Sequence, residues 1–203
     1  MAQAQRTRQR TTVQPASDPF LGDVSDGELV TRAVEGDRWA KEALFRRHVA
    51  PLTKLITRLM ARHRDAEDVV QDAFAKAWRD LDRLRDPEAF GVWLRRIAVN
   101  RFKNVHRRRK VAQALGLDSG VDDASLYALA SHDASPEALA ELRQVDAALR
   151  RIPAEQRVVW ILRHVQGENL ATIAQIADCS LATVKRRLES ADVSLAHHLR
   201  HPR

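Results

Sequence analysis

The chain has 203 residues, enough for one medium domain or two small helical ones. Lys and Arg outnumber Asp and Glu by 34 to 27, and this net charge of +7 favours an acidic partner, nucleic acid before membrane. The sequence has no apolar run long enough to span a bilayer, no apolar signal-peptide core, and a single cysteine, Cys179, which excludes an intramolecular disulfide. We therefore expect a soluble cytoplasmic protein.

The N-terminal part of the chain divides into a polar arm and a short helix. Residues 1–24 contain three arginines and two prolines and are predicted to form a disordered basic arm. Ser25 is a suitable N-cap, and Glu28 follows three residues later, as in a capping box. The sequence therefore predicts a short helix that begins after Ser25 and ends at Gly36.

Two longer helices are expected at residues 37–61 and 65–81. The first has an apolar stripe that starts at Trp39, and Pro51 predicts a bend because proline removes a backbone donor. The second carries acidic and amide side chains in its first turns, opposite its apolar face: Glu67, Asp68, Gln71 and Asp72. One interpretation is that these acidic groups complement the helix dipole. The other is that they form a docking surface for a basic partner.

Residues 90–110 are the most strongly patterned segment. Apolar side chains recur every three or four residues from Phe90 to Val105, which predicts one buried helical face. The opposite face carries Arg95, Arg96, Arg101, Lys103, Asn104 and Arg107. Cations at this density suit a phosphate backbone, and amides such as Asn100 and Asn104 can hydrogen-bond base edges. A solvated basic helix, or one that binds a membrane or a protein, shows the same pattern.

The charge pattern reverses after this helix. Residues 111–142 contain no lysine or arginine, while aspartates and glycines accumulate there. Such a reversal between two patterned regions predicts a linker and a domain boundary. We expect an all-α protein with two small helical domains, residues 25–110 and 135–203, joined by a flexible acidic linker at residues 111–134.

The second domain is predicted to contain a helix-turn-helix. It begins at Ser135, an N-cap followed by proline at the first helical position, and its first helix ends before Pro153. The last two helices are joined by a short turn at residues 178–180, the spacing of a helix-turn-helix, although an ordinary helical hairpin is the alternative. Asp178 tolerates the left-handed backbone that such a turn needs.

The order of these segments resembles the sigma factors of bacterial RNA polymerase, in particular the two-domain extracytoplasmic-function group. The segment DAEDVVQDAFAKAW (residues 65–78) is similar to the helix that binds core polymerase in that family. FGVWLRRIAVNRFKN (residues 90–104) is similar to its −10 element helix, and residues 152–195 resemble its −35-binding domain. The resemblance covers most of residues 25–195, with both domains in family order.

The resemblance implies three groups of site residues. The core-polymerase-binding residues are Asp65, Glu67, Asp68, Gln71 and Asp72. The −10 DNA-binding residues are Trp93, Arg96, Asn100, Lys103, Asn104, Arg107 and Arg108. The −35 DNA-binding residues are Thr183, Lys185, Arg186 and Arg187. Asn100 is expected to read a flipped base in a pocket completed by residues 84–89, whereas the apolar spacing of Trp93 favours a core role over base stacking.

The expected function is that of a sigma factor that binds core RNA polymerase and directs promoter recognition and melting in transcription initiation. The family implies no catalytic residue, cofactor or metal, and its partners are core RNA polymerase, promoter DNA and an anti-sigma factor wedged between the domains. A stand-alone helix-turn-helix transcriptional regulator is the alternative, but it leaves the acidic helix unexplained. A metal-dependent hydrolase is a third reading, but His197, His198 and His201 lack the usual ligand spacing.

The recognition helix departs from the family pattern at two acidic positions. Glu189 and Asp192 stand where the family usually continues with basic residues. We expect them to pair with Lys185 and Arg187 on the helix surface, or to repel nearby phosphates. Both effects would weaken −35 binding.

Overall fold

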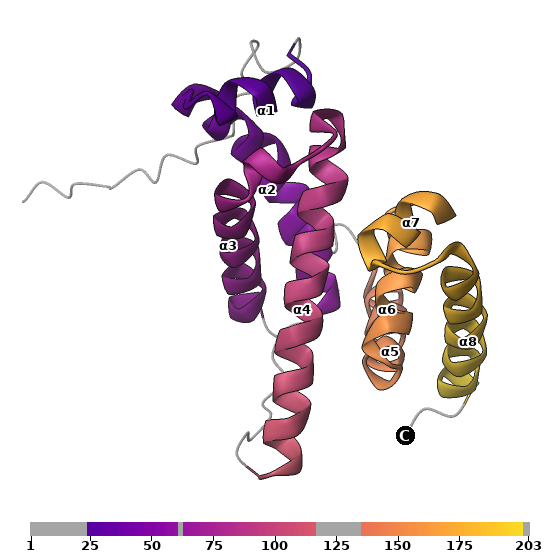
Figure 1. Cartoon of the computed structure of the whole chain (residues 1–203). Coiled ribbons are helices and arrows are strands. Elements are labelled where there is room, and N and C mark those ends of the chain that lie inside the picture. The colour runs from indigo at the N-terminus through magenta and orange to yellow at the C-terminus, as the bar shows by residue number, and fades with distance from the viewer. Residues whose placement is uncertain (1–23, 61–62, 117–134, 201–203) are drawn as a thin grey trace, which may run out of the picture.

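The computed structural model describes residues 24–60, 63–116 and 135–200, and every regular element in these three ranges is helical. The predicted all-α fold is therefore confirmed for this part of the chain. The predicted basic arm and most of the predicted acidic linker lie outside the described residues. Figure 1 shows the helices in two groups, α1 to α4 and α5 to α8, with α7 beside α4. No helix in these ranges is long and apolar enough to cross a membrane.

The first group is built around the long helix α4. Its elements are α1 (Asp26–Val34), α2 (Arg38–Leu59), α3 (His63–Arg79), the 3-10 turns η1 (Leu81–Arg83) and η2 (Pro87–Ala89), and α4 (Phe90–Ala114). Helix α4 packs on α3 and α2, and α1 packs on α2 and η2. The core between them includes the fully buried Leu44, Leu94 and Phe102, and burying a side chain of this size stabilises the fold by about 1.5–3 kcal/mol.

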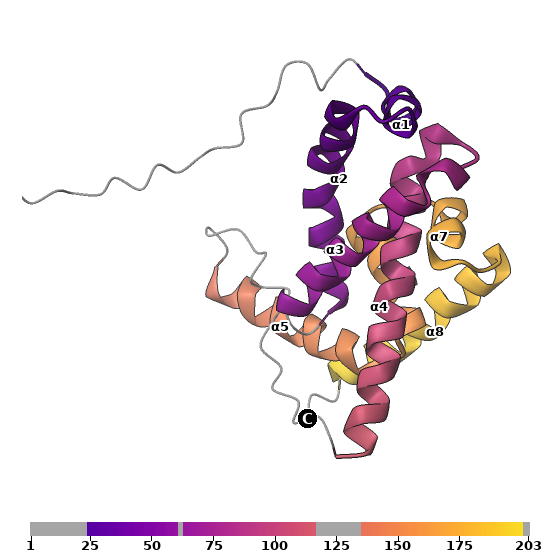
Figure 2. The same ribbon diagram turned by 60° about the vertical axis from the view of Figure 1, so that its left-hand side comes forward.

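Helix α4 is longer than the apolar pattern indicates, because it continues past Lys110 to Ala114. It therefore occupies the start of the segment that the sequence predicts as linker. In Figure 2 its C-terminal turns extend beyond the other helices of the first group. This places the basic end of α4, with Arg107 and Arg108 exposed, away from the core.

Side-chain caps fix the predicted helix starts. The Ser25 Oγ accepts a hydrogen bond from the Glu28 amide at 3.1 Å, and the Ser135 Oγ accepts one from the Ala138 amide at 3.2 Å. Each cap satisfies an amide that has no partner within the helix, and removing one typically costs about 1 kcal/mol. Both predicted starts are confirmed.

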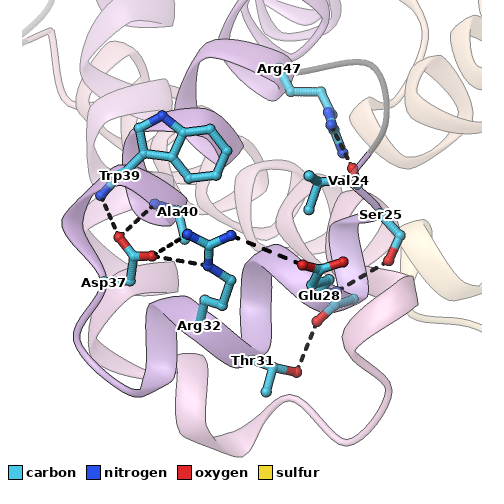
Figure 3. A network of polar contacts seen from close by, with 10 residues as sticks. Val24, Ser25, Glu28, Thr31, Arg32, Asp37, Trp39, Ala40 and Arg47 are labelled. Atoms are coloured by element: carbon cyan, nitrogen blue, oxygen red, sulfur yellow. Dashed lines mark hydrogen bonds and ion pairs between the residues drawn. The ribbon is translucent and has the colours of Figure 1, made fainter. Parts of the chain in front are cut away.

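The prediction that Trp39 begins a buried stripe is wrong. Its side chain remains 40% exposed, and the buried stripe of α2 begins one residue later, at Ala40. The Arg32 guanidinium lies 4.9 Å from the Trp39 ring centroid and bonds the N-cap carboxylate of Asp37 at 2.8 Å (Figure 3). That bond from Arg32 lowers the pKa of Asp37. Trp39 thus covers an ion pair at the junction of α1 and α2.

The second group contains the predicted helix-turn-helix. Its elements are α5 (Pro136–Arg151), α6 (Ala154–Trp160), η4 (Ile161–Val165), α7 (Leu170–Ala177) and α8 (Leu181–Arg200). Asp178 ends α7 in the left-handed region with φ of 56°, as its residue type predicts. The helix expected to continue from α6 instead widens into the π-helical turn η4. Leu142 and Val165 fit the apolar spacing of this group but are exposed.

Candidate nucleic-acid interface

The acidic side chains of α3 include some that are exposed and some that pair with arginines of α4. Glu67, Asp68 and Gln71 are exposed. Asp72 accepts a hydrogen bond from the Arg101 Nε of α4 at 2.7 Å, and an Asp65 oxygen lies 2.5 Å from an Arg109 nitrogen. Asp65 and Asp72, two of the predicted polymerase contacts, therefore each pair with an arginine of α4.

A cavity of about 540 Å³ separates the C-terminal half of α3 from α4. Its volume is typical of small-molecule sites in proteins. Helix α4 contributes Trp93, Arg96, Ile97, Asn100, Arg101 and Asn104. The α3 side contributes cations that no sequence pattern indicated: Lys76, Arg79 and Arg83. This lining combines an amide that can bond a base edge with cations that suit phosphate. It also includes Asp72 and Asp80, which pair with Arg101 and Lys76.

Trp93 is held at the wall of this cavity by aromatic packing. Its ring centroid lies 6.2 Å from that of Phe90, which in turn stacks on Trp78 at 6.0 Å. Trp93 is partly buried against the core and also lines the cavity. The packing fixes the ring before any ligand arrives, so a base entering the cavity would meet a preformed wall.

The loop that leads into α4 is tied to α1. The Ser25 Oγ donates a hydrogen bond to the Glu88 Oε1 of η2 at 2.6 Å. Gly27 permits the close approach, since a Cβ at this position would lie 2.3 Å from the same oxygen. Asp86 caps the turn by accepting from the Glu88 amide at 3.2 Å. Residues 84–89 are thus anchored by α1, which no sequence pattern indicated.

Several cations of α4 contact the second group of helices. The Lys103 Nζ donates to the Ala177 carbonyl oxygen at 2.7 Å, and an Arg96 nitrogen lies 2.6 Å from an Asp178 oxygen. Burial at this contact lowers the pKa of Lys103, and the nearby positive charge of Arg187 lowers it further. Of the predicted −10 residues, Asn104 is bonded to Arg107 at 3.1 Å, and Arg107 and Arg108 are exposed.

The predicted −35 residues lie at the start of α8. Lys185 and Arg186 are exposed there, and Arg187 is half-buried. Thr183 is tied to the preceding turn, because the hydroxyls of Ser180 and Thr183 are 2.9 Å apart and the Ser180 Oγ accepts from the Thr183 amide at 3.2 Å. Two cations at the exposed N-terminal end of a second helix match the way a helix-turn-helix enters a major groove.

Asp192 bonds a tryptophan instead of pairing with Arg187. Its Oδ1 accepts a hydrogen bond from the Trp160 Nε1 at 3.1 Å, so the carboxylate faces α6. A spacing of five residues rotates a side chain by about 140° around a helix, and this separates Asp192 from Arg187. Glu189 is exposed and lies four residues after Lys185. Glu189 therefore keeps the spacing that allows it to pair with Lys185.

Comparison with known proteins supports the same arrangement. Residues 44–111 match the Sigma-70 region 2 family, and residues 142–191 match the Sigma-70, region 4 family. The ECF RNA polymerase sigma factor SigM of Mycobacterium tuberculosis is 34% identical over 175 residues, which cover 86% of this chain and 85% of the relative. The ECF RNA polymerase sigma-E factor of Escherichia coli is 36% identical over 172 residues, covering 81% and 89%.

A solved structure resembles both groups of helices. It is the sigma factor RpoE in complex with the anti-sigma factor NepR from Bartonella quintana, with a TM-score of 0.61 and 28% identity. The match covers 80% of this chain and 98% of that one. By these matches the chain belongs to the extracytoplasmic-function group of the sigma-70 family, whose members are non-enzymatic subunits that direct promoter recognition by RNA polymerase.

Proposed function

We propose that this sigma factor captures the melted −10 element in the cavity between α3 and α4, with Asn100 reading a base. The observation that carries the proposal is the position of Asn100. It lies in a cavity of about 540 Å³ beside Trp93 and between cations of both helices. Extracting a base from the stack costs a few kcal/mol, and preformed contacts to the base and its phosphates offset that cost.

We infer that the anchored loop extends the pocket beyond the described cavity, whose lining includes Arg83 but none of residues 84–89. The bond between Ser25 and Glu88 holds residues 84–89 next to the start of α4. A base that enters beside Asn100 meets Trp93, whose ring is already packed on Phe90, so little conformational entropy is lost on binding. An amide that donates to and accepts from a base edge discriminates between bases by about 1–3 kcal/mol.

The other proposed contacts bind either core polymerase, through α3, or duplex DNA, through α8. On α3, the exposed Glu67, Asp68 and Gln71, with Asp65 and Asp72, dock core polymerase. On α8, Lys185 and Arg186 reach the −35 duplex with support from Thr183 and Arg187. Phosphate contacts from such cations set the position of the helix on DNA without reading sequence.

An anti-sigma factor is a further proposed partner. The RpoE structure from Bartonella quintana, which this chain resembles, was solved with the anti-sigma factor NepR. A cavity of about 750 Å³ lies between α4 and the second group, where such a partner would enter. Since core polymerase and promoter DNA are in the bacterial cytoplasm, the protein acts there.

The proposal is tested with Asn100→Ala in the reconstituted holoenzyme. Permanganate reactivity of −10 thymines should fall, and base preference at one −10 position should relax, while affinity for core polymerase stays unchanged. Gln113→Ala is the matched control, because Gln113 is an exposed amide on the same helix beyond the cavity. Normal melting and normal base preference in the Asn100 variant would show that this amide is structural.

A further inference from the structure

A cavity of about 750 Å³ lies between the C-terminal half of α4 and the start of α6, two helices that contact each other (Figure 1). Its volume is in the range of pockets that hold small-molecule ligands, and it is larger than the cavity beside Trp93. Helix α4 supplies one wall, and residues 153–155 with Asp178 supply the other. The chemistry of these walls indicates which ligand would fit.

Cationic side chains dominate the α4 wall. Three of them line the cavity at spacings of four and three residues, which places them on one face of the helix. They are Lys103, Arg107 and Lys110. Two carboxylates, Glu155 and Asp178, also line the cavity, but Asp178 already pairs with Arg96 at 2.6 Å. The cavity therefore carries an excess of positive charge.

The weak bases of the α4 wall reflect this positive charge. His106 also lines the cavity, and its ring packs against the buried Phe102 at a centroid distance of 5.7 Å. Burial lowers the pKa of His106, and the positive charges of Arg157 and Lys110 lower it further. Burial and a neighbouring cation lower the pKa of Lys103 in the same way. Cations held together in a partly buried site repel one another, and an anion bound among them would offset that repulsion.

The rest of the lining suits the other parts of a nucleotide. The Asn104 side-chain oxygen accepts a hydrogen bond from Arg107 at 3.1 Å, so its NH2 group is the part that can donate to a ligand. Amide side chains of this kind bond the edges of nucleobases. Val111, which is 56% exposed, and Pro153 provide apolar surface on opposite walls, and a base ring can pack against both.

We propose that this cavity is a binding site for a nucleoside polyphosphate. The phosphate groups bond the three cations of α4, and the base lies between Val111 and Pro153, within reach of the Asn104 amide. Three cations balance the charge of a polyphosphate, whereas a single carboxylate would leave most of their charge uncompensated. Lys103 can take part although it donates to the Ala177 carbonyl oxygen, because an ammonium group has three donors.

The proposed ligand overlaps with the −10 strand. Lys103, Asn104 and Arg107 are among the predicted −10 DNA-binding residues, and they cannot bond a nucleotide and the strand at once. A nucleotide in this cavity therefore inhibits −10 capture. This overlap rests on the proposed function, whereas the nucleotide site rests only on the cavity and its lining.

The test is equilibrium binding of fluorescently labelled GTP and ATP to the free full chain, followed by anisotropy. Lys110→Glu reverses one charge of the cavity wall. It should weaken binding by roughly 2- to 30-fold, the combined effect of one lost attraction and one new repulsion in a site open to water. Arg108→Glu is the matched control, because Arg108 is an exposed cation on the same helix outside the cavity lining. Its effect should be smaller than about 2-fold.

Glu155→Gln provides a change in the opposite direction, which partial unfolding cannot mimic. It removes an exposed carboxylate from the lining, so affinity for the labelled nucleotides should rise by about 1.4- to 5-fold. Glu137→Gln, which removes an exposed carboxylate from α5, should leave the affinity unchanged. The site is overturned if the wild type binds neither nucleotide, if Lys110→Glu and Arg108→Glu weaken binding equally, or if Glu155→Gln brings no gain.

Two competitors separate the possible sources of phosphate. Inorganic tripolyphosphate should displace the label less well than unlabelled GTP or ATP, and equal displacement would overturn the assignment of a bound base. An unlabelled single strand with the non-template −10 sequence of a promoter mapped for this protein should also displace the label. If it does not, the overlap is overturned while the nucleotide site stands. If Asn100→Ala is then also silent, the failure lies in the proposed −10 role of α4.

Discussion

Replacing Arg101 with alanine should strengthen the binding of this sigma factor to core polymerase. Arg101 on α4 holds the carboxylate of Asp72, which is a proposed polymerase contact on α3. Docking of Asp72 on a basic polymerase surface therefore requires this intramolecular pair to break. Without Arg101, the Asp72 carboxylate can bind polymerase without the free-energy cost of breaking this pair.

The size of the gain follows from the exposure of the pair. The Arg101 and Asp72 side chains are 40% and 48% exposed, and pairs of this kind contribute about 0.2–1 kcal/mol. Affinity should therefore rise by about 1.4- to 5-fold. Asp72→Ala should act in the opposite direction and by more, because a hydrogen bond to a charged group contributes about 1.5–3 kcal/mol. Neither change should alter the free energy of unfolding by more than about 1 kcal/mol.

The assay is a titration of dye-labelled sigma factor with core polymerase, followed by fluorescence anisotropy without DNA. Arg108→Ala is the control, because it removes an exposed cation from the same helix. The gain for Arg101→Ala should shrink at high salt, since the pair that it removes is weaker there. Weaker binding of the Arg101 variant would refute the competition between Arg101 and polymerase. Unchanged binding of Asp72→Ala would refute the docking role of that carboxylate.

Three further predictions concern other parts of the chain. Gly27→Ala places a Cβ 2.3 Å from the Glu88 Oε1, so the flexible Glu88 side chain must move. The base preference of the holoenzyme on a library of −10 sequences should change, while binding to core polymerase should not. An unchanged base preference would contradict the anchoring role of α1. Burial lowers the pKa of His48 and of His106 below 6.5, so the unfolded state binds more protons and stability should fall as pH drops below that value. In the double variant His48→Gln, His106→Gln, Tm should fall less between about pH 7 and about pH 5 than it does in the wild type. An equally steep fall in Tm would exclude these histidines as the cause. Glu189→Arg should strengthen duplex binding and steepen its salt dependence by about one unit, and a salt titration that shows neither would mean that this side chain points away from DNA.

Features set by local chemistry could be predicted from the sequence. Ser25 and Ser135 cap helices because a hydroxyl can bond an amide two or three residues ahead, whatever surrounds it. Asp178 adopts the left-handed conformation in the turn for a similarly local reason. The amphipathic face of α4 also follows from its spacing, and Leu94 and Phe102 are fully buried as expected.

Features that depend on the phase of a helix or on distant partners could not be predicted. Trp39 has the spacing of an apolar stripe, but in the folded chain the buried side chains of α2 begin at Ala40. Asp192 lies close to the recognition cations in sequence, yet the indole of Trp160 holds it on another face. Arg95 and Glu168 form an ion pair although they are separated by 73 residues, and no local pattern connects them. The cavity and the contact between α4 and α7 therefore depend on the packing of helices that are distant in sequence.

The central claim is that this chain directs core polymerase to promoters and supports their opening. The most direct measurement is transcription in vitro on fragmented DNA of the source bacterium, with sequencing of the RNA 5′ ends, in the presence and absence of the protein. The account predicts a set of start sites that core polymerase alone does not use, preceded by shared −35 and −10 elements. The same start sites with and without the protein, together with duplex binding by the protein alone, would contradict it.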